Sequence, residues 1–360
     1  MAGIFGHLNL DDSEYVYSLT SGQDLIWDAA QQYLDRVNMD IMSAVSIFVS
    51  EETESFKERY KLPGGGYLQR RRSEGRYGTV KASGSWDVAY PLEDFGAQVS
   101  GSDVDMAYMT VRELDNHIQT VTIQDVNTVR WEMLHALLDN VNATFVDERH
   151  GSLTVCRLAN TDSTTYPPVL GSASDADDEH YLESNYAATA ISDTNNPYET
   201  MVNEIVEHFG ESVGGDEIVV FINQAEAPET MDLTDFVQVE DSFIRSGANA
   251  DVPVNLPNVP GKIIGRIAGA GACWVSQWRW MPANYMLAVH TGVPGPLKMR
   301  VDPAATGLGR GLQLVAQDES FPWTSSFYRH RFGFGAGNRL NGVVMELGTG
   351  GTYTVPTDYD

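Results

Sequence analysis

The most constraining feature of the sequence is a basic segment at residues 57–81 in an acidic chain. The segment contains only two acidic residues, and its basic residues are Lys57, Arg59, Lys61, Arg70, Arg71, Arg72, Arg76 and Lys81. Its formal charge of about +6 leaves about −33 for the rest of the chain, whose total is −27. The run Pro63-Gly64-Gly65-Gly66 is typical of a hairpin tip. We therefore expect a long two-stranded ribbon that rests on another part of the protein, because a lone hairpin is marginal in water.

The overall composition narrows the class of protein. Hydrophobic residues make up 42% of the chain and charged residues 20%, which is typical of a folded protein. The large negative charge disfavours close binding to nucleic acid or to anionic membranes. No apolar run reaches the roughly 18 residues of a membrane-spanning helix, and the N-terminus does not resemble a signal peptide. We expect a soluble intracellular protein with reduced thiols at Cys156 and Cys273.

Hydrophobic periodicity predicts helices separated by loops. A helix is expected after Ser21, following an acidic arm at residues 1–20, and apolar residues at helical spacing continue to residue 48. The clearest helix is predicted over residues 123–142. Its apolar stripe comprises Ile123, Val126, Val129, Met133, Leu137, Leu138 and Val141. Further helices are predicted at residues 198–209 and 232–243, and residues 160–195 are expected to form a loop.

Apolar runs and turn residues predict that the second half is rich in strands. Strands are expected at residues 152–158, 218–222, 263–267, 274–280 and 286–290, with Trp278 and Trp280 on one face. Residues 327–332 and 342–347 are predicted to form a hairpin around Gly333, Gly335 and Gly337. The expected fold class is α+β, with no internal repeat.

This order of elements resembles the major capsid protein of tailed bacteriophages, with the Hong Kong 97-like fold. The run Val219-Val220-Phe221-Ile222-Asn223 is similar to its axial-domain strand, and the segment from Tyr328 to Pro356 to its last peripheral strands. The resemblance implies an N-arm and helix at residues 1–50 and an extended E-loop at 51–100. It implies a peripheral domain with a long spine helix at 101–184, an axial domain at 185–290, and peripheral return strands at 291–360.

The same resemblance implies a function. The chain would self-assemble, as pentamers and hexamers, into an icosahedral phage head that encloses double-stranded DNA without sequence-specific binding. It would belong to the virion and assemble in the host cytoplasm. It would act with a portal, a separate scaffolding protein and, in some heads, a decoration protein. The eight cations of residues 57–81 would contact neighbouring subunits. Lysines of this segment and Asn338 or Asn341 are candidates for a covalent cross-link, but non-covalent assembly is favoured.

The residues do not predict an active site, a cofactor or a metal centre. The glycine-rich runs at residues 307–311 and 333–337 match no phosphate-binding motif, and the eight histidines show no zinc spacing. Two alternatives stay open at this point. One is an encapsulin-like compartment, which would share the fold. The other is a soluble enzyme or carbohydrate-binding protein of a different fold.

Overall fold

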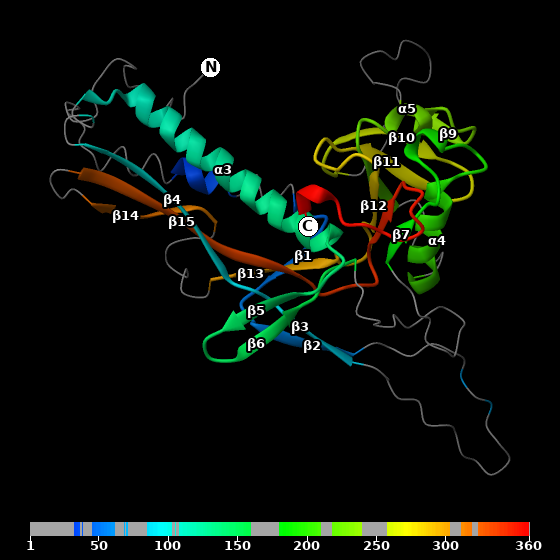
Figure 1. The fold of residues 1–360 in the computed structure, drawn as a ribbon, viewed down its shortest axis with the longest axis horizontal. Helices are drawn as coiled ribbons and strands as arrows, with labels where there is room; N and C mark the ends of the chain where they lie inside the picture. Colours follow the sequence, from blue (N-terminus) through cyan, green and yellow to red (C-terminus); the bar gives the residue numbers. More distant parts are fainter. Residues whose placement is uncertain are drawn as a thin grey trace.

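The computed structural model describes residues 32–36, 38, 45–61, 68, 70, 85–102, 105, 108–159, 180–209, 218–239, 258–302, 311–318 and 323–359. Their strands form a five-stranded sheet, a seven-stranded sheet and two antiparallel pairs. A long helix lies along the five-stranded sheet, and the seven-stranded sheet lies at the other end of the molecule (Figure 1). The expected α+β class is confirmed.

The five-stranded sheet joins segments that are far apart in the sequence. Its strands are β1 (Val49–Thr53), β4 (Glu93–Ser102), β13 (Leu297–Val301), β14 (Gln313–Asp318) and β15 (Trp323–Ala336). β15 pairs with β4 along one side, and with β14 and then β13 along the other. β1 completes the sheet by pairing in parallel with β13. The long strand β15 therefore organises the sheet.

The predicted C-terminal hairpin is wrong. β15 continues through Gly333 and Gly335, and β16 (Val343–Glu346) belongs to the other sheet. A Cβ atom on Gly333 would lie 2.4 Å from the carbonyl oxygen of Pro91, and one on Gly335 would lie 2.9 Å from Cδ1 of Tyr90. These glycines let the segment at Tyr90 and Pro91 pass close to β15. From sequence alone, a glycine with this role inside a strand cannot be distinguished from a glycine in a turn.

The seven-stranded sheet contains the strands predicted from short apolar runs. In spatial order they are β7 (Tyr181–Glu183), β16, β12 (Tyr285–His290), β8 (Ile218–Ile222), β11 (Cys273–Gln277), β10 (Lys262–Ile267) and β9 (Phe236–Gln238). All five residues of β8 are buried, which confirms the prediction of a core strand. One face of the sheet packs on α4 (Pro197–Phe209), and the other joins a core shared with the five-stranded sheet.

The long helix is α3 (Val111–Leu138), and it begins and ends earlier than predicted. Thr110 and Glu113 form a capping box that starts the helix, and Asp139 ends it. Two residues of the predicted stripe, Ile123 and Val141, are exposed. The buried face instead includes polar residues such as Asp125, whose carboxylate lies 2.7 Å from Nδ1 of the buried His330 on β15. Hydrophobic periodicity cannot detect a buried face that is partly polar.

Three smaller predictions are corrected. The helix expected at residues 232–243 is instead α5 (Ala227–Met231), with a proline in its first turn, and the chain then enters β9. The loop expected at 160–195 contains β7 and the short helix η3 (Ala188–Ala190) in its described part. β11 ends before Trp278, so Trp278 is buried while Trp280 is exposed. A last short helix, η7 (Thr357–Tyr359), contacts α3.

Candidate functional site at the base of the basic ribbon

The basic segment begins, as predicted, as one strand of a two-stranded ribbon. β2 (Lys57–Lys61) pairs antiparallel with β3 (Ser85–Ala89), and Arg59 lies opposite Asp87. The predicted tip at residues 63–66 lies outside the described residues. We call the pair β2 and β3 the ribbon, and its base is the end next to β1 and to Tyr90.

Two of the predicted contact residues form ion pairs inside the ribbon. Lys57 Nζ lies 2.8 Å and Arg59 Nε 2.6 Å from the carboxylate of Asp87. Hydrogen bonds from Arg59 and then from Lys57 lower the pKa of Asp87 well below its usual range. Exposed pairs of this kind contribute little to stability, but they neutralise part of the positive charge near the base.

The other predicted contact residues lie farther along the segment. Lys61 is the last residue of β2, and Arg70 is exposed. Arg71, Arg72, Arg76 and Lys81 lie outside the described residues. The role of all eight cations in contacts between subunits therefore stays a prediction.

The ribbon rests on a second antiparallel pair, as the instability of a lone hairpin requires. β5 (Ala143–Asp147) and β6 (Gly151–Val155) lie beside it (Figure 1). Ala89 of the ribbon packs with Leu153 and Val155 of β6, and Phe56 and Phe145 adjoin them. Burying the side chains of Leu153 and Val155 contributes roughly 1.5–3 kcal/mol each. This apolar contact fixes one side of the base.

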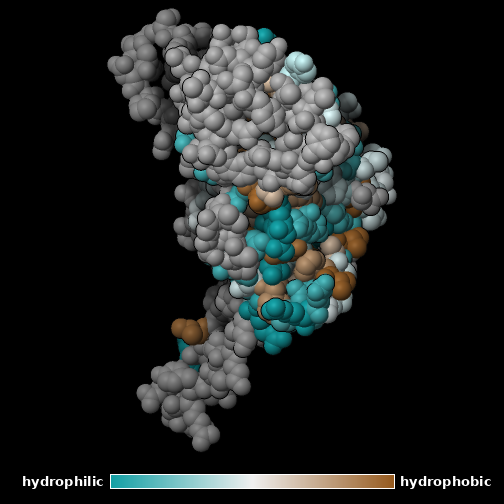
Figure 2. All heavy atoms as spheres, turned by 90° about the vertical axis from the view of Figure 1, so that its left-hand side faces the viewer, coloured by the Kyte–Doolittle hydropathy of each residue, from teal (hydrophilic) through white to brown (hydrophobic). Residues whose placement is uncertain are grey.

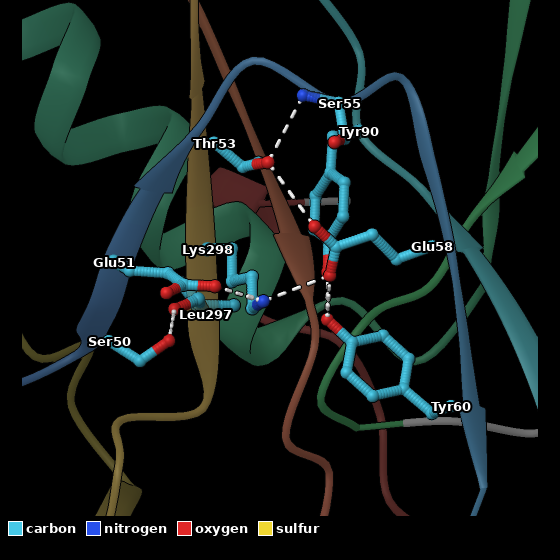
Figure 3. A network of polar contacts seen from close by, with 9 residues as sticks. All are labelled: Ser50, Glu51, Thr53, Ser55, Glu58, Tyr60, Tyr90, Leu297 and Lys298. Atoms are coloured by element: carbon cyan, nitrogen blue, oxygen red, sulfur yellow. Dashed lines mark hydrogen bonds and ion pairs between the residues drawn. The ribbon is translucent and has the colours of Figure 1, made fainter.

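A polar network fixes the other side of the base (Figure 3). Lys298 on β13 bonds Glu51 of β1, and its Nζ lies 2.9 Å from Oε2 of Glu58 on β2. Thr53 Oγ1 donates to the other oxygen of Glu58 at 3.2 Å. Lys298 thus connects the five-stranded sheet to β2 of the ribbon.

Two tyrosines extend this network. Tyr60 Oη donates to Glu58 Oε2 at 2.7 Å, and the hydroxyl of Tyr90 lies 2.6 Å from that of Tyr60. Because the single proton of Tyr60 goes to Glu58, Tyr90 is the donor in the second bond. The bonds therefore run from Tyr90 after β3, through Tyr60 on β2, to Glu58 and Lys298. Both strands of the ribbon are held at one point.

The electrostatics of the network favour charged Lys298 and charged Glu58. Burial disfavours the charge on Glu58, but hydrogen bonds from Tyr60 and Lys298 outweigh it, so the pKa of Glu58 is lowered. Burial also opposes the charge on Lys298, yet its bonds to Glu51 and Glu58 raise its pKa. Burial raises the pKa of Tyr90, which keeps its hydroxyl protonated. The network is thus an anchor held by charge, and it contains no nucleophile activated for catalysis.

Sequence reasoning missed this anchor. Glu58 and Tyr60 alternate along the ribbon and so share one face, which is the only local signal. Lys298 lies 240 residues beyond Glu58 and stands in an ordinary strand, so nothing in the pattern links the two. The contact exists because β1 pairs in parallel with β13, which only the tertiary structure establishes.

The candidate cross-link residues differ in exposure. Asn341 is fully buried, and its amide donates to the carbonyl oxygens of His290 and Pro294, each at 3.0 Å. Its Oδ1 accepts from the backbone N–H of His290 at 2.9 Å. Asn338 is partly exposed and donates to the carbonyl of Pro294. Asn341 is therefore inaccessible to a lysine of another subunit. It instead connects the segment between β12 and β13 to the segment between β15 and β16, the two places where the chain passes directly from one sheet to the other.

The surface outside the anchor is chemically mixed. Figure 2, which views the molecule from the left-hand side of Figure 1, shows hydrophobic side chains scattered among hydrophilic ones on the described part of this face. Within the described ranges, no three His, Cys, Asp or Glu side chains are grouped to hold a metal ion. Among those same residues, no helix has the length and apolar character needed to cross a membrane.

Comparison with known proteins adds to this picture. No protein-family model matches the sequence, and no curated protein matches it. A solved structure of Mycobacterium phage Patience superposes with a TM-score of 0.68 at 18% identity, covering 96% of this chain and 94% of that chain. The chain shares its fold with this phage protein.

Two other matches are weaker. The capsid of a native GTA particle gives a TM-score of 0.47 at 12% identity, with 85% of this chain and 90% of that chain covered. The mature capsid of bacteriophage PhiM1 gives 0.43 at 9% identity, with 83% and 85% covered. We rest no argument on these lower scores. The predicted resemblance to tailed-phage capsid proteins is confirmed at the level of the fold, and the fold shared with the Mycobacterium phage structure covers 96% of this chain.

Proposed function

We propose that this chain is a structural capsid subunit, not an enzyme, that assembles with copies of itself into the shell of a phage head. The fold shared with the Mycobacterium phage structure over 96% of the chain is the observation that carries this proposal. The anchored ribbon supports it, because the network at its base positions the chain on both sides of the basic segment.

The finer proposal follows the Hong Kong 97-like plan. The five-stranded sheet with α3 would form the peripheral domain, the seven-stranded sheet the axial domain, and the ribbon the start of the E-loop. The subunits would form pentamers and hexamers of an icosahedral head around double-stranded DNA, and the head would assemble in the host cytoplasm. A portal, a separate scaffolding protein and a decoration protein are proposed partners. A carboxylate-rich inner wall would repel phosphates and let the genome slide.

The charges refine which cations would reach a neighbour. Asp87 already pairs with Lys57 and Arg59 near the base, whereas Arg70 is exposed. The cations beyond β2 are therefore the better candidates for contact with the acidic surface of an adjacent subunit. Complementary charge of this kind mainly sets register and partner choice. Several weak contacts acting together keep each subunit in the shell.

The alternatives gain no support. The structure that superposes with a TM-score of 0.68 comes from a phage, so an encapsulin-like compartment is not favoured over a phage shell. The polar network contains no activated nucleophile, and the capsid fold suggests a structural role instead of an enzymatic or carbohydrate-binding one.

Charge reversal in the E-loop tests the proposal. Arg70, Arg71, Arg72 and Arg76 are all replaced by Glu. We expect subunits that fold, as judged by far-UV circular dichroism, but that form no shells in negative-stain electron microscopy and elute as small species in size-exclusion chromatography. The physical reason is that a segment of reversed charge repels the acidic surface it should contact.

A matched control carries the same change in net charge elsewhere. It replaces four exposed cations of other elements, namely Arg112, Arg149, Lys262 and Arg279, by Glu. We expect shells to form more readily from this control than from the E-loop variant. Normal shells from the E-loop variant would refute the role of these cations, and a wild-type protein that stays monomeric would refute the shell function itself.

A further inference from the structure

Two buried histidines face each other between the seven-stranded sheet and α4. His180 precedes β7, and His208 is in the last turn of α4. Their Nε2 atoms are 3.1 Å apart, and the ring centroids are 5.1 Å apart in a stacked arrangement. His180 is fully buried and His208 is 4% exposed. Neither residue belongs to the anchor of the ribbon.

The hydrogen bonds determine how many protons the pair can hold. Nδ1 of His180 lies 2.7 Å from the carbonyl oxygen of Gly342, and a carbonyl only accepts, so Nδ1 carries the proton. Nε2 of neutral His180 is then an acceptor, and Nε2 of His208 donates to it. A further proton on His180 would require His208 to change tautomer so that its Nε2 accepts the bond. If both rings were protonated, two Nε2 donors would face each other, so the closed pair can carry one extra proton at most.

The surroundings of the pair disfavour charge on His180. Burial, with smaller contributions from the neighbouring His208 and the buried Arg339, lowers the pKa of His180 to about 3, although the bond to the carbonyl of Gly342 opposes the shift. On α4, Oε1 of Glu207 lies 3.7 Å from Nε2 of His208. β16 presents Val343 and Met345 to this core, and β12 presents Met286 and Ala288, with His290 at the end of the same face.

We propose that the His180–His208 pair is an acid-sensitive latch that releases α4 from the seven-stranded sheet. The closed latch can hold one extra proton at most, whereas both imidazoles can take up protons once α4 separates from the sheet and water reaches them. Opening is therefore coupled to the uptake of at least one proton. The five-stranded sheet lacks this pair and should not open with it.

The expected effect follows from linkage. A histidine in water has a pKa of about 6.5, so the open state gains protons as the pH falls below that value. Because the open state binds more protons, α4 is held most firmly above pH 6.5 and is released progressively below it. With one proton taken up, the ratio of open to closed states rises about tenfold between pH 7.5 and 5.5. It rises about a hundredfold if both histidines take up protons on opening.

Hydrogen exchange of the full-length chain tests the latch. Exchange is measured by mass spectrometry at pH 7.5 and 5.5 in the presence of EDTA, and each rate is divided by the intrinsic chemical rate at that pH. Peptides covering residues 197–209 should show at least about a tenfold rise in opening, and peptides covering β13 should not. The variant His180→Asn can keep a donor toward Gly342 but cannot be protonated. The control His117→Asn changes an exposed histidine of α3.

The outcomes decide the proposal. It is supported if the wild type and His117→Asn show the rise while His180→Asn shows less than about a threefold change. It is overturned if the wild-type helix shows less than a threefold change, or if His180→Asn keeps the full rise. Should His180→Asn fail to fold, the wild-type comparison of residues 197–209 with β13 decides by itself, because a general acid effect would open both.

Discussion

Replacing Lys298 by methionine tests whether the polar network holds the ribbon onto the five-stranded sheet. Methionine keeps most of the apolar stem of the lysine but removes the charge and all three donors. The side chain of Lys298 is 15% exposed, that of Glu58 26% and that of Glu51 57%. The two ion pairs therefore differ in how strongly water screens them.

The magnitude follows from this difference. The exposed pair with Glu51 contributes at most about 1 kcal/mol. A buried hydrogen bond to a charged group contributes about 1.5–3 kcal/mol, and partial exposure of Glu58 reduces that value. The loss also leaves Glu58 with the donors Tyr60 and Thr53 alone. We expect Lys298→Met to lower the free energy of unfolding by about 1–2 kcal/mol in total.

The assay is urea denaturation of unassembled subunits, with Lys262→Met as the control at an exposed lysine of another strand. The control should change the free energy of unfolding by less than about 0.5 kcal/mol. A double-mutant cycle with Glu58→Gln isolates the pair, and its coupling energy should be about 0.5–2 kcal/mol. Equal losses in Lys298→Met and Lys262→Met, together with zero coupling, would refute the reasoning.

Two further predictions concern the core around β15. Asp125→Ala removes the carboxylate that lies 2.7 Å from Nδ1 of the buried His330 and should lower the free energy of unfolding by about 1–3 kcal/mol, whereas Gln124→Ala on the exposed side of α3 should cost less than about 0.5 kcal/mol. Equal losses for the two variants in urea denaturation would contradict this role of the hydrogen bond. Gly335→Val places a side chain against Tyr90 and Ala89 and should cost about 1–3 kcal/mol or more. Gly350→Ala, where the nearest atom to a new Cβ lies 3.6 Å away, is the matched change, and thermal unfolding midpoints that fall equally in both variants would exclude the steric explanation.

Local patterns predicted elements wherever local physics decides them. The helix at residues 198–209 was correctly predicted because most of the face of α4 that packs on the sheet is apolar. The run at residues 218–222 was correctly predicted as a buried strand because both faces of β8 are covered. The ribbon was predicted from charge and turn residues, and its need for support is met by β5 and β6.

The errors share one cause, which is that a neighbour distant in sequence changes the meaning of a residue. Asp125 is buried on α3 because His330 neutralises the cost of its burial, so the true face of the helix did not appear apolar. Gly333 and Gly335 resemble turn residues, yet they lie within a strand because Pro91 and Tyr90 pass close to them. The anchor at Lys298 carries no sequence signal for the same reason.

The sequence by itself determined the class of the molecule: an acidic, folded α+β chain with a basic ribbon that depends on support from elsewhere. These properties can be predicted from the sequence because composition requires no knowledge of contacts, and because periodicity and turn residues depend only on residues a few positions apart. Only the tertiary structure decided which strands share a sheet, where the ribbon is anchored and that His180 meets His208. The residues of the His180–His208 contact are 28 positions apart and those of the Glu58–Lys298 contact are 240 apart, and the free energy of such pairs depends on burial and geometry that no local pattern contains.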